Sequence, residues 1–279
     1  MTKLLFRHLS LALIFTLILS IYPVVKAAPQ PSKVWENEVI LKQQQRQKPK
    51  TPKATNTPRE SGLISRIISF ILPPKGAPGQ RTYAAARADC PAIKKSMTAL
   101  VPPTNIGLTI SERPTFWFYI PYQPTSTNPV EFLLLNENNK EAYKTTLQLT
   151  NTPGIISITL PQNSPALESG KKYNWVLSFI CDPENRLKDT FVKGYIERVS
   201  INSNLKNQLE RVSTPREQIL LFAENSLWYD ALTLLAEERR KKPNDTQLAK
   251  DWKDLLQLPK VELQEFVSEP IISCCRSTQ

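Results

Sequence analysis

The sequence is nearly without histidine, since its one histidine, His8, lies in an apolar leader near the start of the chain. Once that leader is removed, the chain holds no imidazole. Ser-His-Asp and Cys-His catalysis both depend on an imidazole base, so neither mechanism is available to the mature chain. A metal site with histidine ligands is excluded for the same reason.

Glycine is also scarce, with seven in 279 residues, and neither GxGxxG nor GxxxxGK[ST] occurs. Nucleotide-binding loops need glycine because the phosphates approach bare backbone. The sequence therefore excludes such a loop. Together the two shortages predict a protein that is not an enzyme, with no catalytic residues, no cofactor and no bound metal.

The N-terminal residues have the layout of a secretory signal peptide. Lys3 and Arg7 precede an apolar run at 9–25, and the small residues that follow suit cleavage after Ala27. We predict a signal peptide over residues 1–27 and an exported protein of the periplasm or cell envelope. The alternative is an uncleaved membrane anchor, because the run is nearly long enough to span a bilayer.

The chain has four cysteines, Cys90, Cys181, Cys274 and Cys275. In an oxidising compartment they are expected to form two disulfides, and the sequence permits three pairings. Adjacent cysteines rarely bond to each other, so we expect Cys274 and Cys275 to bridge separately to Cys90 and Cys181. Such bridges would make the C-terminus a clasp. The alternative is that the adjacent pair forms a reactive thiol or metal site.

The net charge of +11 is concentrated in the N-terminal part of the chain. Residues 29–95 hold thirteen Lys or Arg against four Asp or Glu, whereas residues 96–279 hold twenty against twenty-one. Because the folded part is neutral, nucleic acid is not an expected partner. We expect a protein or cell-envelope partner, and the sequence leaves the oligomeric state open.

Residues 28–95 predict a disordered basic tether, because they are rich in Pro and Gln and have little to bury. Apolar residues at helical spacing interrupt the tether at 61–72. We expect this segment to dock on the main domain. The alternative is an anchor for a membrane surface or a partner, so membrane contact is expected only from this segment or from the leader.

Residues 96–200 carry the signals of short strands separated by Pro- and Asn-rich turns. The stretch "PTFWFYIP" (114–121) is a strand bounded by prolines, and "KKYNWVLSFICD" (171–182) alternates so that Trp175 shares a face with Cys181. Six or seven such strands at regular intervals predict an antiparallel, immunoglobulin/fibronectin-like β-sandwich.

From residue 201 the apolar period changes to that of helices. The stretch "TPRE" (214–217) predicts a capping box, in which Thr214 and Glu217 exchange hydrogen bonds at a helix start. Three consecutive amphipathic helices predict a small bundle over 201–279 that ends in the Cys-Cys tail. The expected fold class is α+β.

The helical stretch "FAENSLWYDALTLLAEERRKKPND" (222–245) resembles one tetratricopeptide helix pair. Phe222, Ala231 and Pro243 fall at the aromatic, small and terminating positions of that repeat, whereas Glu238 stands where the repeat prefers alanine. A peptide-binding superhelix needs about three repeats, and no second copy follows. The alternative is a helical cap on the sandwich.

Five segments in order carry a wider resemblance. They are "ALVPPTNIGLTISERPTFWFYIPY", "PGIISITLP", "LESGKKYNWVLSFICD", "WYDALTLLAEERR" and the terminal "EPIISCC". Together they resemble the cyanobacterial domain-of-unknown-function 928 family over roughly residues 95–275. The resemblance implies an exported protein in the envelope of a photosynthetic bacterium. It implies no reaction.

Two groups of side chains are candidate sites. Trp117, Tyr119 and Tyr122 are a candidate ligand surface, such as a face for stacking carbohydrate, with core packing as the alternative. Acidic side chains at 182, 184 and 189 lie around one loop and are candidates for calcium, but they lack the fixed spacing of known calcium loops, so a solvated turn is favoured.

The sequence thus predicts an exported, non-catalytic binding or scaffolding protein of the bacterial cell envelope. One alternative is a thiol- or metal-dependent redox protein that uses Cys274 and Cys275. The other is a hydrolase of the envelope that depends on carboxylates.

Overall fold

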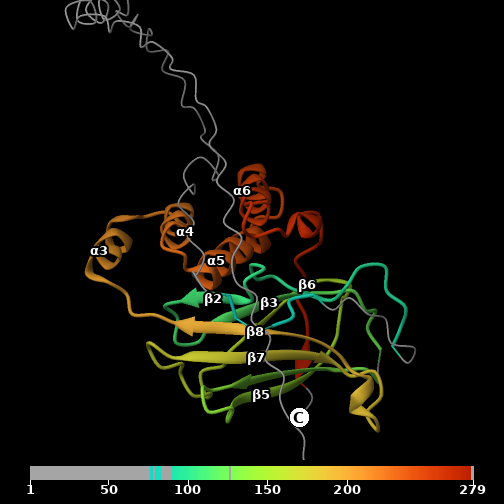
Figure 1. Ribbon diagram of the computed structural model, residues 1–279. Helices are drawn as coiled ribbons and strands as arrows, with labels where there is room; N and C mark the ends of the chain where they lie inside the picture. Colours follow the sequence, from blue (N-terminus) through green and yellow to red (C-terminus); the bar gives the residue numbers. More distant parts are fainter. Residues whose placement is uncertain (1–75, 78, 83–89, 126, 278–279) are drawn as a thin grey trace, which may run out of the picture. The chain divides into compact units, whose positions relative to one another are not determined.

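The computed structural model describes residues 76–77, 79–82, 90–125 and 127–277 (Figure 1). The predicted signal peptide at 1–27 and the apolar segment at 61–72 lie outside these residues. Within the described residues, no helix combines the length and apolar character that crossing a membrane requires.

A small sheet forms one layer of the fold, with its strands in the order β1-β3-β6. These strands are β1 (Thr98–Ala99), β3 (Thr115–Ile120) and β6 (Gly154–Thr159), and both pairs are antiparallel. Every residue of the central strand β3 is buried. A strand with no exposed residue must be covered on both faces of its sheet.

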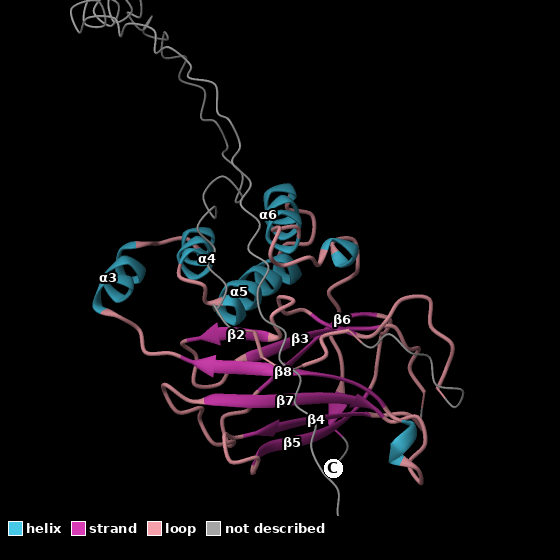
Figure 2. Cartoon of the chain, in the orientation of Figure 1, coloured by secondary structure: helices cyan, strands magenta, loops and turns pink. Residues whose placement is uncertain are grey.

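A larger sheet forms the second layer, with its strands in the order β2-β8-β7-β4-β5-β9 (Figure 2). The strand β2 runs parallel to β8, and the other pairs are antiparallel. The strands are β2 (Ile106–Thr109), β4 (Val130–Leu135), β5 (Glu141–Gln148), β7 (Lys172–Phe179), β8 (Thr190–Arg198) and β9 (Arg276–Ser277).

Aromatic side chains fill the space between the two sheets. The ring of Phe116 on β3 lies 4.8 Å from that of Phe132 on β4, and the ring of Phe118 lies 5.5 Å from that of Trp175 on β7. Alternate residues of β7 are buried, as the sequence pattern predicts. The predicted antiparallel β-sandwich is confirmed.

Four α-helices follow β8 in the described residues. They are α3 (Ser203–Arg211), α4 (Pro215–Glu224), α5 (Trp228–Lys241) and α6 (Thr246–Leu256). Three of them, α3, α4 and α6, begin with a side-chain cap. The predicted capping box is present at the start of α4, where the Thr214 hydroxyl accepts from the Glu217 amide. The Asp245 carboxylate caps α6 in a similar way, by accepting from the backbone amides of Gln247 and Leu248.

The helix α5 lies against β2 and β3 (Figure 1). Gly107 on β2 permits this approach, because a Cβ there would lie 2.7 Å from the Tyr229 ring. The Tyr229 hydroxyl accepts from the Trp175 indole at 2.8 Å and donates to the Tyr195 carbonyl at 3.2 Å. The helical part is therefore joined to the core of the sandwich by a buried hydrogen-bonded side chain.

The described part of the predicted tether is ordered against the sandwich, which corrects that prediction for these residues. Gln80 forms a bridge to Lys193, and Thr82 forms one to Thr98. The guanidinium of Arg81 donates to the carbonyls of Val101 and Val261 at 3.0 and 2.7 Å. Composition does not predict this contact, because it counts Arg81 only as one more basic residue and carries no information about the carbonyls that Arg81 binds.

The C-terminal tail joins the edges of both sheets. The amide of Ile155 on β6 donates to the Pro270 carbonyl at 2.8 Å, and the Ile272 amide donates back to the Ile155 carbonyl at 2.9 Å. A few residues later, β9 pairs with β5. The tail was expected to belong to the helical region, and its described residues instead cover two sheet edges that would otherwise present unpaired backbone groups.

Candidate functional site

The three aromatic residues predicted as a ligand surface are buried, so that prediction is wrong. Their exposed fractions are 2% for Trp117, 6% for Tyr119 and 2% for Tyr122. The Trp117 indole donates to the Thr233 hydroxyl of α5 at 3.0 Å. Tyr119 packs its ring 5.1 Å from that of Phe266. The helical region covers this face of the small sheet. Trp117 and Tyr119 therefore serve in packing, which was the alternative interpretation.

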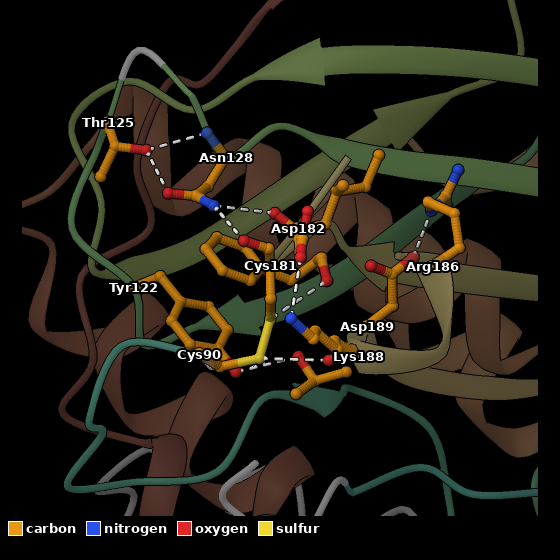
Figure 3. Close-up of a disulfide and its surroundings, with 12 residues drawn as sticks. Cys90, Tyr122, Thr125, Asn128, Cys181, Asp182, Arg186, Lys188 and Asp189 are labelled. Atoms are coloured by element: carbon orange, nitrogen blue, oxygen red, sulfur yellow. Dashed lines mark hydrogen bonds and ion pairs between the residues drawn. A yellow bond between two sulfur atoms is a disulfide. The ribbon is translucent and has the colours of Figure 1, made fainter. Parts of the chain in front are cut away.

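Tyr122 is buried in a different way, beside the disulfide shown in Figure 3. Its ring stacks on Phe179 with the centroids 3.7 Å apart, and its hydroxyl lies 2.9 Å from that of Thr190. It therefore packs at the end of the sandwich and presents no face to solvent.

The cysteines pair as Cys90–Cys181 and Cys274–Cys275. The predicted pairing of the terminal cysteines with Cys90 and Cys181 is wrong. Cys181 follows β7, where Cys90 lies with its Cα 5.1 Å away. The terminal pair lies between the tail's contacts with β6 and β5. The tail is therefore attached to the sandwich by backbone hydrogen bonds and not by the disulfides that were predicted.

Two of the three predicted acids near the first disulfide, Asp182 and Asp189, pair with cations (Figure 3), and the third, Glu184, is exposed. Lys188 donates to Asp182 at 2.9 Å, and this hydrogen bond holds the pKa of the Asp182 carboxyl below its ordinary value. Arg186 donates to Asp189 at 2.6 Å. In the described part of the chain, no three His, Cys, Asp or Glu side chains are grouped to hold a metal ion. Because Asp182 and Asp189 already pair with cations, a solvated turn explains these acids better than a calcium site does.

A cleft of about 250 Å³ lies where the sandwich meets α4 and α5. We call it the seam cleft. The polar side chains that line it come from both parts of the fold and include Thr109, Ser111, Arg113, Asp230, Thr233 and Glu237.

Asp230, in the first turn of α5, is the carboxyl of the seam cleft whose pKa is raised by burial. Its carboxylate accepts from the Thr109 hydroxyl at 3.2 Å and from the Ile110 amide at 3.1 Å. Burial raises the pKa of Asp230 to about 6, against the opposing effect of these two donors. Both hydrogen-bond donors are neutral. Above that pH, these hydrogen bonds and the positive end of the α5 dipole stabilise the negative charge of Asp230.

Glu237 and Arg113 complete the charges of the seam cleft. Glu237 lies two turns after Asp230 on the same side of α5, because a spacing of seven residues returns to one helix face. Arg113 donates to the Ser164 carbonyl at 3.2 Å and lies 3.8 Å from the carboxylate of Glu112. With Arg113 already beside Glu112, the two acids on α5 give the cleft an excess of negative charge.

Local sequence patterns do not identify the polar residues of the seam cleft. An acid in the first turn of a helix normally stabilises that helix, and nothing local indicates that Asp230 also binds the end of β2, some 121 positions earlier. The available signal was the row of polar side chains at 230, 233 and 237, which α5 carries opposite its apolar stripe.

The protein is a β-sandwich of the immunoglobulin/fibronectin type, and helices cover one of its faces. The chain belongs to the family described as Domain of Unknown Function (DUF928), which matches residues 76–271. A comparison with curated proteins finds no match. Among solved structures, the chain is similar to the fn3 domain of human collagen alpha-1(XX) chain, at 11% identity over 47% of this chain and 97% of that one, with a TM-score of 0.25.

Proposed function

We propose that this chain is an exported, non-catalytic binding protein of the bacterial cell envelope and that the seam cleft holds its ligand. The observation that supports this function is the convergence of polar side chains from two separate parts of the fold on one cleft. Binding clefts occur preferentially at such junctions. In this proposal, α4 and α5, the pair that resembles a tetratricopeptide repeat, supply one wall of the site.

The size of the seam cleft limits what it holds. Its volume of about 250 Å³ lies below the roughly 300–1,000 Å³ typical of sites for drug-sized ligands. The occupant is therefore one small group, the size of a side chain or a single sugar, that projects from a larger partner. The excess negative charge from Asp230 and Glu237 favours an amine-bearing group.

The same two acids support binding better than hydrolysis. Seven residues of helix separate Asp230 and Glu237 by about 10 Å along the axis. Paired carboxylates in glycoside hydrolases lie about 5–9.5 Å apart, on either side of the bond that is cleaved. Because both acids line one wall, they do not flank a substrate, and they act by making the cleft negative for a cationic group.

A titration with two sugars tests this function. Glucosamine carries an ammonium group, and N-acetylglucosamine is its neutral counterpart. Added to the protein purified from the cells that make it, glucosamine is expected to shift the NMR amide signals of Ile110 and Thr233 at pH 7, whereas N-acetylglucosamine leaves them in place.

Variants decide whether the shifts arise in the seam cleft. We expect Glu237→Gln to weaken glucosamine binding at least fivefold, whereas Glu141→Gln, at an exposed position on β5, leaves it unchanged. Equal shifts with both sugars, or the same affinity in Glu237→Gln, would overturn the proposal.

Export is tested separately, by sequencing the N-terminus of the protein recovered from the periplasmic fraction. The proposal expects a chain that begins at Ala28. Recovery of the intact chain from the cytoplasm would contradict the envelope location and leave the binding test unaffected.

A further inference from the structure

A second cleft, of about 420 Å³, lies between the end of α5 and the segment that leads to the C-terminal tail. We call it the arginine pocket. Its polar lining consists of Arg239 and Arg240 from the last turn of α5, with Ser268, Glu269 and Ser273 from the opposite wall.

Both arginines of the pocket lie over aromatic rings. The guanidinium of Arg239 lies 5.3 Å from the ring centre of Trp252, and that of Arg240 lies 5.1 Å from the ring centre of Trp117. A guanidinium that contacts a ring through its face keeps its N–H edges available as donors. The stacking therefore fixes the position of both guanidinium groups and leaves their N–H groups free of the ring contacts.

One donor nitrogen of Arg239 has no partner within the described residues. Its Nη1 is buried and has no hydrogen-bond partner there. Burial, with no opposing carboxylate, lowers the pKa of this guanidinium from its ordinary value. Buried polar groups without partners are rare in folded proteins, and each calls for an explanation such as a ligand.

The one carboxylate on the wall of the pocket is already engaged. Glu269 forms an ion pair with Lys95, which also donates to the Glu265 carbonyl at 2.9 Å. Its charge is therefore balanced by Lys95. The negative end of the α5 dipole, equivalent to about half a charge, offsets only part of the two positive charges of Arg239 and Arg240.

We propose that the arginine pocket binds a phosphate group, with Arg239 and Arg240 as its charged ligands and the hydroxyls of Ser268 and Ser273 as further donors. Two guanidiniums match the charge of a phosphate monoester, about −1.5 to −2 near neutral pH, better than that of a single carboxylate. This inference goes beyond the proposed function, because it concerns different residues and a ligand of opposite charge.

Calorimetric titration with inorganic phosphate tests the pocket. We expect saturable binding to the purified protein and at least a tenfold weaker affinity in Arg240→Gln. Arg211→Gln is the matched control, because Arg211 also lies in the last turn of a helix but is exposed on α3, away from the pocket. It is expected to bind phosphate like the unaltered chain.

A flotation assay with vesicles that contain phosphatidic acid distinguishes a lipid headgroup from a free ion as the source of the phosphate. Binding to either probe that is lost in Arg240→Gln and retained in Arg211→Gln supports the pocket and identifies its source. Equal binding by both variants, or no binding to either probe, overturns it. Thermal unfolding separates lost binding from lost folding: Arg240→Gln, which loses its stacking on Trp117, is expected to unfold at a slightly lower temperature than Arg211→Gln but to be fully folded at the temperature of the titration.

Discussion

The two faces of strand β3 are both buried, but in different chemical surroundings. On the inner face, Phe116 and Phe118 meet rings of the larger sheet. On the outer face, Trp117 meets α5, where it donates to Thr233 and lies beneath Arg240. Phe116 and Phe118 thus make ring-on-ring contacts on the inner face, whereas Trp117 on the outer face combines ring contacts with polar ones.

This difference indicates where binding is expected. Packing between apolar rings closes an interface to near-solid density and leaves no room for a ligand. At the outer face, polar and charged side chains must also be satisfied, and both the seam cleft and the arginine pocket include residues of α5, the helix that covers this face. The seam between sandwich and helices is therefore where we expect a ligand to bind.

The largest expected effects compare the two faces of β3 directly. We expect Phe118→Ala and Trp117→Ala each to reduce the free energy of unfolding by about 3–5 kcal/mol, because each removes a fully buried ring. Urea unfolding measures both. A loss below about 1 kcal/mol for Trp117→Ala would show that the helices are only loosely attached and that the outer face of β3 is not a packed interface.

The two disulfides differ in the length of chain that each constrains. The Cys90–Cys181 bridge spans 91 residues, and its replacement by a pair of serines is expected to cost about 2–5 kcal/mol. The Cys274–Cys275 bridge closes no loop of that kind, so the same change there is expected to cost close to zero. Peptide mapping with and without reduction checks the pairing, and a cross-bridge between the two pairs would contradict the structure.

Asp230 gives the seam a pH dependence. Its pKa rises from 3.8 in the unfolded chain to about 6 in the folded protein, so the folded state binds more protons between these values. Stability from this group is therefore greatest below about pH 4 and falls as the pH rises to about 6, by roughly 2–3 kcal/mol.

The variant Asp230→Asn isolates this effect from the other titrating groups. The difference in unfolding free energy between the unaltered chain and the variant is expected to change across pH 4–6 and to be constant above about pH 7. A difference that is flat throughout that range would show that Asp230 is not desolvated.

A smaller effect is expected from the hydrogen bond that the Trp117 indole makes on the outer face of β3. Thr233→Val keeps the shape of the side chain but removes the acceptor of the Trp117 indole. We expect a loss of about 1–2 kcal/mol, because the buried N–H is left without a partner. Trp117→Phe is the matched control, since it removes the donor as well. If Thr233→Val costs nothing in the Trp117→Phe background but is costly alone, the hydrogen bond is the cause.

Local patterns predicted much of the fold. The alternation along β7 and the capping box at Thr214 depend on neighbouring residues only, and both are confirmed. The stretch "PTFWFYIP" was correctly identified as a strand. Its lack of polar residues on either face also indicates cover on both sides, which argues against an exposed ligand surface at Trp117 and Tyr119.

The rest depends on contacts between distant segments. The bond between Thr109 and Asp230, the pairing of Cys90 with Cys181, and the approach of Ser273 to Arg239 each join parts of the chain that no local pattern relates. Their positions follow from how the helices and the tail pack on the sandwich. Both candidate clefts therefore became visible only in the structure.

One NMR experiment tests the central claim that the seam is the binding surface. Glucosamine and inorganic phosphate are added in turn to the same sample at pH 7. The account predicts that glucosamine shifts the amides of Ile110 and Thr233, that phosphate shifts those of Arg239 and Arg240, and that the amides of β7 do not move. Shifts centred on β7, or no shifts with either compound, would contradict it.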